Sequence, residues 1–298
     1  MSAGPRLIID AHQHFWDPSR AAYPWMAGEA MAPLRRPYGP GDLAPLLAAS
    51  GVGAALLVQC RHDAAETEEF LAIAAATPFV AGVVGWVDLE GADVAGEIAR
   101  LRALPGGAHL VGLRHNVHDE PDADWLSRPG VRRGLDAAFA AGLTFDLLVR
   151  ARELPAAIAC VRHFPTAPFV LDHMAKPPIA GGFDEQWAAR FEEIAAFGNV
   201  WCKLSGLVTE ANWGDLAPAT FDPYLALARR AFGRRRLIFG SDWPVATLAA
   251  PYDAVKTLAH RCFPDDPDAE SRLFAGNAID AYRLAALLPR LSHRETSP

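Results

Sequence analysis

The stretch LIIDAHQH at residues 7–14 passes from an apolar run into two histidines that are separated by one residue. An apolar run this short predicts a buried β-strand. Side chains alternate between the two faces of a strand, so His12 and His14 should point the same way. Two imidazoles side by side at a strand end can chelate a divalent metal ion or stabilise an oxyanion, and ordinary packing rarely requires such a pair.

Seven further apolar runs follow the first, and helix-like patterns separate them. We expect eight strands, at Leu7–Ala11, Gly53–Gln59, Phe79–Val87, Leu110–Arg114, Leu143–Val149, Phe169–Asp172, Val200–Leu204 and Leu237–Gly240. Between the strands, apolar residues recur at the spacing of amphipathic helices. One of these helices is expected to begin at Asp222-Pro223, with the aspartate as N-cap and proline in the first turn.

Strands that alternate with helices predict a parallel sheet covered by helices, which is an α/β fold. Eight such units in 298 residues favour a single-domain (β/α)8 TIM barrel over residues 1–298. A doubly wound open sheet is the alternative. No G-x-G-x-x-G motif follows the first strand, which argues against a dinucleotide-binding sheet.

Two segments should lie outside the regular units. The first, at about residues 15–45, is rich in proline and aromatic residues, and we expect it to form a long loop over the mouth of the barrel. The second is a polar C-terminal tail after about residue 290.

Composition excludes several classes of protein. The formal net charge is −7 and no basic stripe is present, so nucleic acid is not an expected partner. Cys60, Cys160, Cys202 and Cys262 are far apart and form no C-x-x-C pair, which disfavours structural zinc and dithiol chemistry. No signal peptide or membrane-length apolar stretch is evident, so we expect a cytoplasmic protein without a membrane partner. The sequence leaves the oligomeric state open.

Polar residues occur at nearly every predicted strand end, where a (β/α)8 barrel collects its chemistry. Burying so many ionisable groups is costly without partners, so packing alone does not explain them, although one or two could form structural ion pairs. These residues are His12, His14, Gln59, Glu66, Arg114, His115, Asp146, Asp172, His173, Lys176, Lys203, Ser205 and Asp242.

Asp242, in the stretch FGSDWP at residues 239–244, is the candidate general base. In a closed barrel the last strand lies beside the first, which would bring Asp242 close to His12 and His14. Gly240 would permit a close approach of the backbone. The structural alternative is an aspartate that only shapes the turn before Trp-Pro.

Neighbouring residues on a regular strand face opposite sides, so Arg114 and His115 should not both point into the barrel, and the same limit applies to Asp172 and His173. We expect His173 to be the catalytic member of its pair, because it lies at the outer end. Arg114 is the expected clamp for an anion or hydroxyl. A salt bridge from Arg114 to Asp146 or Asp172 is the alternative.

Other candidate substrate-binding residues also have structural alternatives, of equal weight for Lys203 and of greater weight for the tryptophans. Lys203 could bind substrate oxygens or pair with a neighbouring carboxylate. Trp16, Trp86 and Trp243 could stack on a sugar ring at the mouth or belong to the core.

Taken together, the motifs resemble those of the amidohydrolase superfamily, amidohydrolase-2 type. They are most similar to its TIM-barrel sugar lactonases, the L-fuconolactonase and L-rhamnono-lactonase type, a branch that also contains dicarboxylate and muconolactone lactonases. The resemblance covers almost the whole chain. Its motifs are IDAHQHFW at 9–16, YPW at 23–25, GLRH at 112–115, LDH at 171–173, KLSG at 203–206 and FGSDWP at 239–244.

The resemblance implies hydrolytic opening of a sugar-acid lactone, as part of carbohydrate metabolism. In this interpretation Asp242 activates water, and the histidines stabilise the oxyanion directly or through one metal ion. The implied catalytic residues are His12, His14, His173 and Asp242. The implied substrate-binding residues are Arg114, His115, Lys203, Trp16 and Trp243.

The resemblance also bears on the metal. Many amidohydrolases have a metal-binding histidine on the fifth strand, where this chain has Asp146, and binuclear members have a bridging lysine or glutamate in the middle strands, where this chain has Leu113-Arg114-His115. Two metals are therefore not expected. One divalent ion, zinc by preference, and metal-free catalysis both stay open, because the family contains both. The ligands of a single ion would be His12, His14, His173 and Asp242.

Two other functions stay open at this point. A metal-dependent decarboxylase of the same superfamily is disfavoured by the absence of the fifth-strand histidine. A non-catalytic sugar-acid-binding barrel is disfavoured by the complete set of polar strand ends. The particular lactone and its ring size lie beyond the sequence.

Overall fold

The computed structural model describes residues 7–288, so the polar tail expected after about residue 290 lies outside the described residues. Eight parallel strands follow one another around a single sheet in chain order. All eight predicted strands are present, with ends that shift by at most a few residues. They are β1 (Ile9–Gln13), β2 (Ala54–Val58), β3 (Val80–Gly85), β4 (Leu110–His115), β5 (Thr144–Leu147), β6 (Phe169–Leu171), β7 (Val200–Leu204) and β8 (Leu237–Phe239).

The sheet closes into a barrel where the first and last strands meet. Two backbone hydrogen bonds join them: the Asp242 N–H donates to the His12 carbonyl at 2.7 Å, and the His14 N–H donates to the Trp243 carbonyl at 2.8 Å. Gln13 and Trp243 form a parallel bridge at the same place. The fold is therefore the expected (β/α)8 barrel and not the open sheet.

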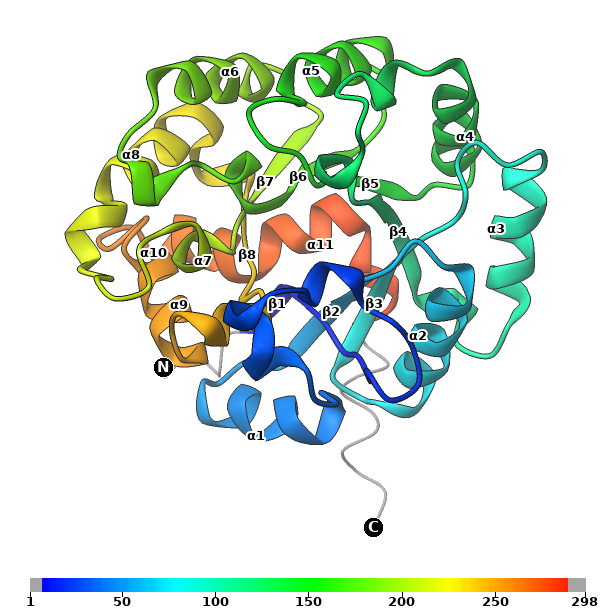
Figure 1. Ribbon diagram of the computed structural model, residues 1–298, viewed down its shortest axis with the longest axis horizontal. Coiled ribbons are helices and arrows are strands. Elements are labelled where there is room, and N and C mark those ends of the chain that lie inside the picture. The colour runs from blue at the N-terminus through cyan, green and yellow to red at the C-terminus, as the bar shows by residue number, and fades with distance from the viewer. Residues whose placement is uncertain (1–6, 289–298) are drawn as a thin grey trace.

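Helices surround the ring of strands, as Figure 1 shows. Nearly continuous apolar strands require such cover on the outside of the sheet. The helices are α1 (Pro40–Ala49), α2 (Ala64–Ala76), α3 (Val94–Ala103), α4 (Pro129–Ala140), α5 (Leu154–His163), α6 (Glu185–Ala195), α7 (Leu207–Glu210), α8 (Pro218–Phe232), α9 (Tyr252–His260), α10 (Pro267–Ser271) and α11 (Asn277–Tyr282). None of the helices within residues 7–288 combines the length and apolarity of a membrane span.

The C-terminal helix α11 crosses behind the centre of the ring (Figure 1) and seals one end of the barrel. It lies at the amino ends of the strands: the Thr144 hydroxyl, at the start of β5, donates to the Ala281 carbonyl at 2.7 Å. Asn277 donates to the Leu237 carbonyl, at the start of β8, also at 2.7 Å. Because this end is plugged, a substrate has access only from the carboxyl end.

The segment after β1 and the start of α8 differ from what the sequence predicts. Between β1 and α1, residues 14–39 hold two 3-10 turns, at Pro24–Met26 and Glu29–Leu34, and α1 begins at Pro40. The helix expected to start at Asp222 begins instead at Pro218, so that prediction is wrong. Pro218 takes the first turn, where its missing N–H has no partner to lose, and Pro223 lies inside the helix.

Candidate active site

A cavity opens at the carboxyl ends of the strands, as expected for this fold. Both strongly polar and apolar side chains line it. They are His14, Trp25, Cys60, Arg114, Asn116, His118, Asp119, Leu148, His173, Lys176, Asp242 and Val245.

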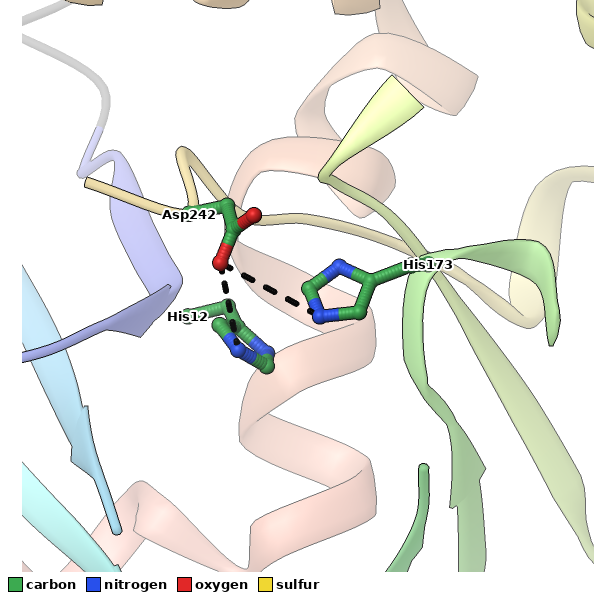
Figure 2. A group of neighbouring side chains, drawn as sticks. All are labelled: His12, His173 and Asp242. Atoms are coloured by element: carbon green, nitrogen blue, oxygen red, sulfur yellow. Dashed lines mark ion pairs between the residues drawn. The ribbon is translucent and has the colours of Figure 1, made fainter. Parts of the chain in front are cut away.

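Three imidazoles and one carboxylate converge at the floor of this cavity. The Nε2 atoms of His12 and His14 lie 3.1 Å apart. The Oδ1 atom of Asp242 lies 3.4 Å from His14 Nε2, 3.7 Å from His12 Nε2 and 4.0 Å from His173 Nε2. Figure 2 shows His12 and His173 approaching the same oxygen of Asp242 from β1 and from the segment after β6. The structure thus brings together all four residues that the resemblance implied.

The opposite nitrogen of each ring is held by a partner outside the cluster. His14 Nδ1 donates to the Val58 carbonyl at 2.8 Å. His173 Nδ1 lies 2.9 Å from the Ser205 hydroxyl, and His12 Nδ1 lies 3.3 Å from Asp172. These partners fix the ring orientations, so all three Nε2 atoms face Asp242. Such partners on the far nitrogen are typical of metal-ligating histidines.

Burial sets the protonation states of the cluster. It lowers the pKa of His14 below its ordinary value of 6.5, and it lowers the pKa of His12 and His173 much further. Burial works against ionisation of Asp242, but its electrostatic contacts with His173 and His14 lower the pKa of Asp242 below its ordinary 3.8. At neutral pH the site holds neutral imidazoles and a carboxylate, which is the charge state that a general base requires.

The cluster fits a single divalent metal ion. The ligand atoms of His12, His173 and Asp242 all lie within 4.8 Å of one another. Neutral imidazole nitrogens and a carboxylate oxygen are the donors that zinc prefers. With His14 Nδ1 donating to Val58, its Nε2 carries a lone pair that faces His12 Nε2 at 3.1 Å. A proton or a cation between the two nitrogens would make this contact favourable.

A left-handed turn places His173. Strand β6 ends at Leu171, and His173, Met174, Ala175 and Lys176 all have positive φ, between 51° and 58°. Each such residue without glycine costs about 1 kcal/mol or more. The turn corrects our expectation that Asp172 and His173 face opposite sides, which holds only while a strand continues.

Both residues of that pair therefore reach the site. Asp172 lies beneath His12, and His173 lines the cavity. For the other pair, Arg114 and His115, the strand does continue to His115, and the expected division between the two faces is confirmed.

Arg114 already forms several hydrogen bonds and an ion pair with other residues of the protein. Its Nη1 lies 3.1 Å from Asp172 Oδ2 and 3.1 Å from His12 Nε2, and its Nη2 donates to the Gln59 carbonyl. The salt bridge to Asp172, one of the two alternatives for this residue, is thus present. Arg114 still lines the cavity, so part of its side chain faces the space that a ligand would occupy.

Lys203 lies below the cluster and does not line the cavity. Its side chain is fully buried, and its ammonium lies 2.5 Å from Asp146 and 2.9 Å from Asp172. The Tyr282 hydroxyl, on α11, donates to Asp146 at 2.8 Å. This network connects the site to α11, which closes the amino end of the barrel. Lys203 thus pairs with neighbouring carboxylates, which is the structural alternative that the sequence offered for it.

The remaining predicted substrate-binding residues lie away from the cavity. His115 stacks between His62 and Trp125, with ring centroids 3.8 Å and 3.9 Å away. Trp16 and Trp243 are 4% and 3% exposed and belong to the hydrophobic core. Neither has a free face on which a sugar ring could stack.

A second group of possible metal ligands, His62, His115 and Glu120, fits a metal poorly. His115 Nδ1 accepts from Trp86 Nε1 at 3.1 Å, so its Nε2 carries the hydrogen that Glu120 accepts at 2.8 Å. His62 Nε2 accepts the backbone N–H of Asn116 at 3.0 Å. Both imidazoles of this group therefore already have donors on their lone pairs, and a metal would have to displace both. In the first cluster, within residues 7–288, only the contact of His12 Nε2 with Arg114 Nη1 would have to be displaced.

Several cavity-lining residues escaped prediction from the sequence. Asn116, His118 and Asp119 follow β4, and Trp25 comes from the loop after β1. Lys176, which the sequence showed as a polar residue beyond the sixth strand without assigning it a role, also lines the cavity. The signal for these residues in the sequence is their position shortly after a strand end. That position does not indicate the direction in which the loop turns.

Known proteins resemble this chain in sequence and in structure. A family profile described as Amidohydrolase matches residues 9–284. A protein named L-fucono-1,5-lactonase from Burkholderia ambifaria is 44% identical over 283 residues, which cover 93% of this chain and 95% of that protein. An L-fucono-1,5-lactonase from Burkholderia multivorans is 40% identical over 292 residues, with 93% and 96% covered. A crystal structure of an amidohydrolase from Burkholderia multivorans with bound zinc has a TM-score of 0.87 at 39% identity, with 93% and 99% covered.

Proposed function

Because this chain belongs to the amidohydrolase family, we propose that it is a hydrolase that opens the lactone of a sugar acid to the free acid. One structural observation carries the proposal: an ionised carboxylate, Asp242, lies within 4.0 Å of three convergent imidazole nitrogens at the open end of the barrel. The two L-fucono-1,5-lactonase relatives, at 44% and 40% identity over 93% of the chain, support a sugar lactone as the substrate class.

Asp242 is the group that moves the proton. Its carboxylate accepts a proton from water as the oxygen attacks the lactone carbonyl carbon. The ring oxygen then leaves and receives that proton from Asp242. A lactone carbonyl is more electrophilic than an amide, so one general base with one oxyanion-stabilising group is sufficient for this reaction.

We propose that the oxyanion forms above His12, His14 and His173. These three histidines and Asp242 would hold one divalent ion, and zinc is supported by the donor set and by the zinc-bound structure of the relative. Bound there, the ion would polarise the carbonyl and compensate the developing negative charge. The residues of the chain orient the water on Asp242 and exclude bulk solvent, because the four side chains are 5% exposed or less.

We also propose a cytoplasmic location. The four cysteines, all within the described residues, are unpaired and buried, which suits a reducing compartment.

A pH-indicator assay with a lactone panel tests the proposed function. The panel contains L-fucono- and L-rhamnono-lactones in both ring sizes, with carbon dioxide release as a parallel measurement. We expect acid release from at least one sugar lactone and no carbon dioxide. Binding of the lactones without any acid release would overturn the proposal in favour of a sugar-acid-binding barrel.

A further inference from the structure

The left-handed turn after β6 presents two side chains to the cavity and two to the core. His173 and Lys176 line the cavity, whereas Met174 and Ala175 are fully buried. The Met174 carbonyl accepts from Trp187 Nε1, on α6, at 3.1 Å. The turn is closed by the Lys176 N–H, which donates to the His173 carbonyl at 2.8 Å. Packing thus holds the strained backbone in a conformation that directs both His173 and Lys176 to the cavity.

Lys176 is the cation of the cavity with donors to spare. An ammonium has three N–H donors. Within residues 7–288 its hydrogen-bond acceptor is Glu210, at the end of α7, at 2.7 Å. Arg114, the other cation of the cavity wall, already donates to Asp172, His12 and the Gln59 carbonyl, and its Nε–H, which has no partner among the described residues, is buried. Lys176 is therefore the cation best placed to bind a ligand, a role that the sequence suggested for Arg114 and Lys203.

The two cations of the cavity wall each have a carboxylate partner. Arg114 pairs with Asp172 at 3.1 Å and Lys176 with Glu210 at 2.7 Å, and Arg150 is a more distant partner of Glu210 at 3.4 Å. A substrate carboxylate beside Lys176 would lose its hydration and meet an ammonium that Glu210 already neutralises, which is unfavourable. A hydroxyl, in contrast, can accept from the ammonium and donate to a carboxylate such as Asp119.

We propose that Lys176 binds a hydroxyl of the lactone and that Glu210, by neutralising it, selects neutral sugar lactones over lactones that carry a carboxylate. This inference rests on the proposed lactonase function and names the residues that set its substrate class. Glu210 acts as a positioning residue, because it reaches the substrate only through Lys176.

The test uses two lactones of the same ring size and stereochemistry, L-galactonolactone and L-galactarolactone, which differ only in a terminal CH2OH or carboxylate. We expect kcat/KM of the wild-type enzyme to be about a hundredfold higher for the neutral lactone than for the lactone that carries a carboxylate. Lys176→Met should raise KM for the neutral lactone about tenfold and change kcat by less than about threefold, while Lys176→Arg should restore most of the affinity.

Glu210→Gln is the decisive variant because it keeps an acceptor for Lys176 but removes the negative charge. It should raise kcat/KM for L-galactarolactone about tenfold and leave that for L-galactonolactone within about threefold. Lys256→Met, whose ammonium binds the Ser50 carbonyl at 2.7 Å outside the cavity, and Arg150→Gln, the more distant partner of Glu210 at 3.4 Å, are the matched controls.

An unchanged KM in Lys176→Met, or an unchanged preference in Glu210→Gln, would overturn the inference and leave the lactonase function intact. If the wild-type protein hydrolyses neither lactone nor any member of the panel, the proposed function itself fails. Calorimetry then makes the same comparison on binding: Lys176 is still supported if L-galactonolactone binds and Lys176→Met weakens it about tenfold.

Discussion

The carboxylate of Asp10 accepts the backbone N–H of Ser241 at 2.8 Å, and this bond ties the first strand to the residue that precedes Asp242, the proposed general base. The same oxygen accepts the backbone N–H of His12 at 3.2 Å. The other oxygen accepts the Tyr252 hydroxyl, from α9, at 2.9 Å. One fully buried carboxylate thus sets the distance between His12 and Asp242 across the seam of the barrel.

Asp10→Asn should lower the free energy of unfolding by about 1–3 kcal/mol, since an amide cannot replace all three of these charge-assisted hydrogen bonds. It should also lower kcat, because His12 and Asp242 lose their common support. Urea unfolding and steady-state kinetics check the two effects. Asp253→Asn, at an exposed carboxylate on α9, is the control. Equal stability of Asp10→Asn and the wild type would refute the structural role.

Asp242→Asn should lower kcat by about two to four orders of magnitude, because the amide cannot accept the proton of water. The folded structure should persist, because an amide of the same size fills the same space. Initial rates on the best lactone of the panel measure the effect, with circular dichroism to confirm folding. Near-normal turnover would show that another group is the base.

Protein expressed in zinc-supplemented medium should contain about one zinc ion per chain, as expected for a single three- or four-ligand site. His12→Ala and His173→Ala should lose most of it, whereas His118→Ala should keep it, because His118 lines the cavity but lies outside the cluster. Elemental analysis after gel filtration gives the stoichiometry. Zinc that stays bound in both cluster variants would place the ion elsewhere.

The pH dependence of kcat/KM should have only an acid limb. The pKa values of His12, His14 and His173 are lowered from 6.5 by burial, so their neutral forms predominate above pH 6.5 and are lost only as pH falls further. The pKa of Asp242 lies below 3.8, so this group stays ionised over the same range. Rates measured from pH 5 to 8 should be constant above pH 6.5. An apparent pKa above 6.5 would contradict neutral, buried imidazoles.

Lys203→Met should destabilise the fold by about 3–5 kcal/mol, because it leaves the buried carboxylates of Asp146 and Asp172 without their shared cation. Adding Asp146→Asn should recover part of the loss, which a double-mutant cycle in urea would measure. If Lys203→Met instead keeps its stability and raises KM, then Lys203 contacts the substrate, as its functional interpretation held.

The eight strands were predictable because each is buried on both faces and reads as a short apolar run, a pattern that needs no partner to be recognised. The proximity of His12, His14 and Asp242 was predictable because the ring order of a barrel places the last strand beside the first, and His173 was implied by the family resemblance. The substrate-binding residues were not. Lys203 and Arg114 appeared as free cations in the sequence, and their pairing with Asp146 and Asp172 became visible only across the barrel.

The sequence by itself determined the barrel and the proximity of His12, His14 and Asp242, because periodicity and strand order are properties of the chain read in one dimension. Only the tertiary structure decided which cation is free for a ligand. Lys203 meets Asp146 across 57 residues of sequence, and Lys176 reaches the cavity through a left-handed turn that packing against α6 sustains. Ion pairing in a buried space depends on distances between remote residues, and local patterns do not contain those distances.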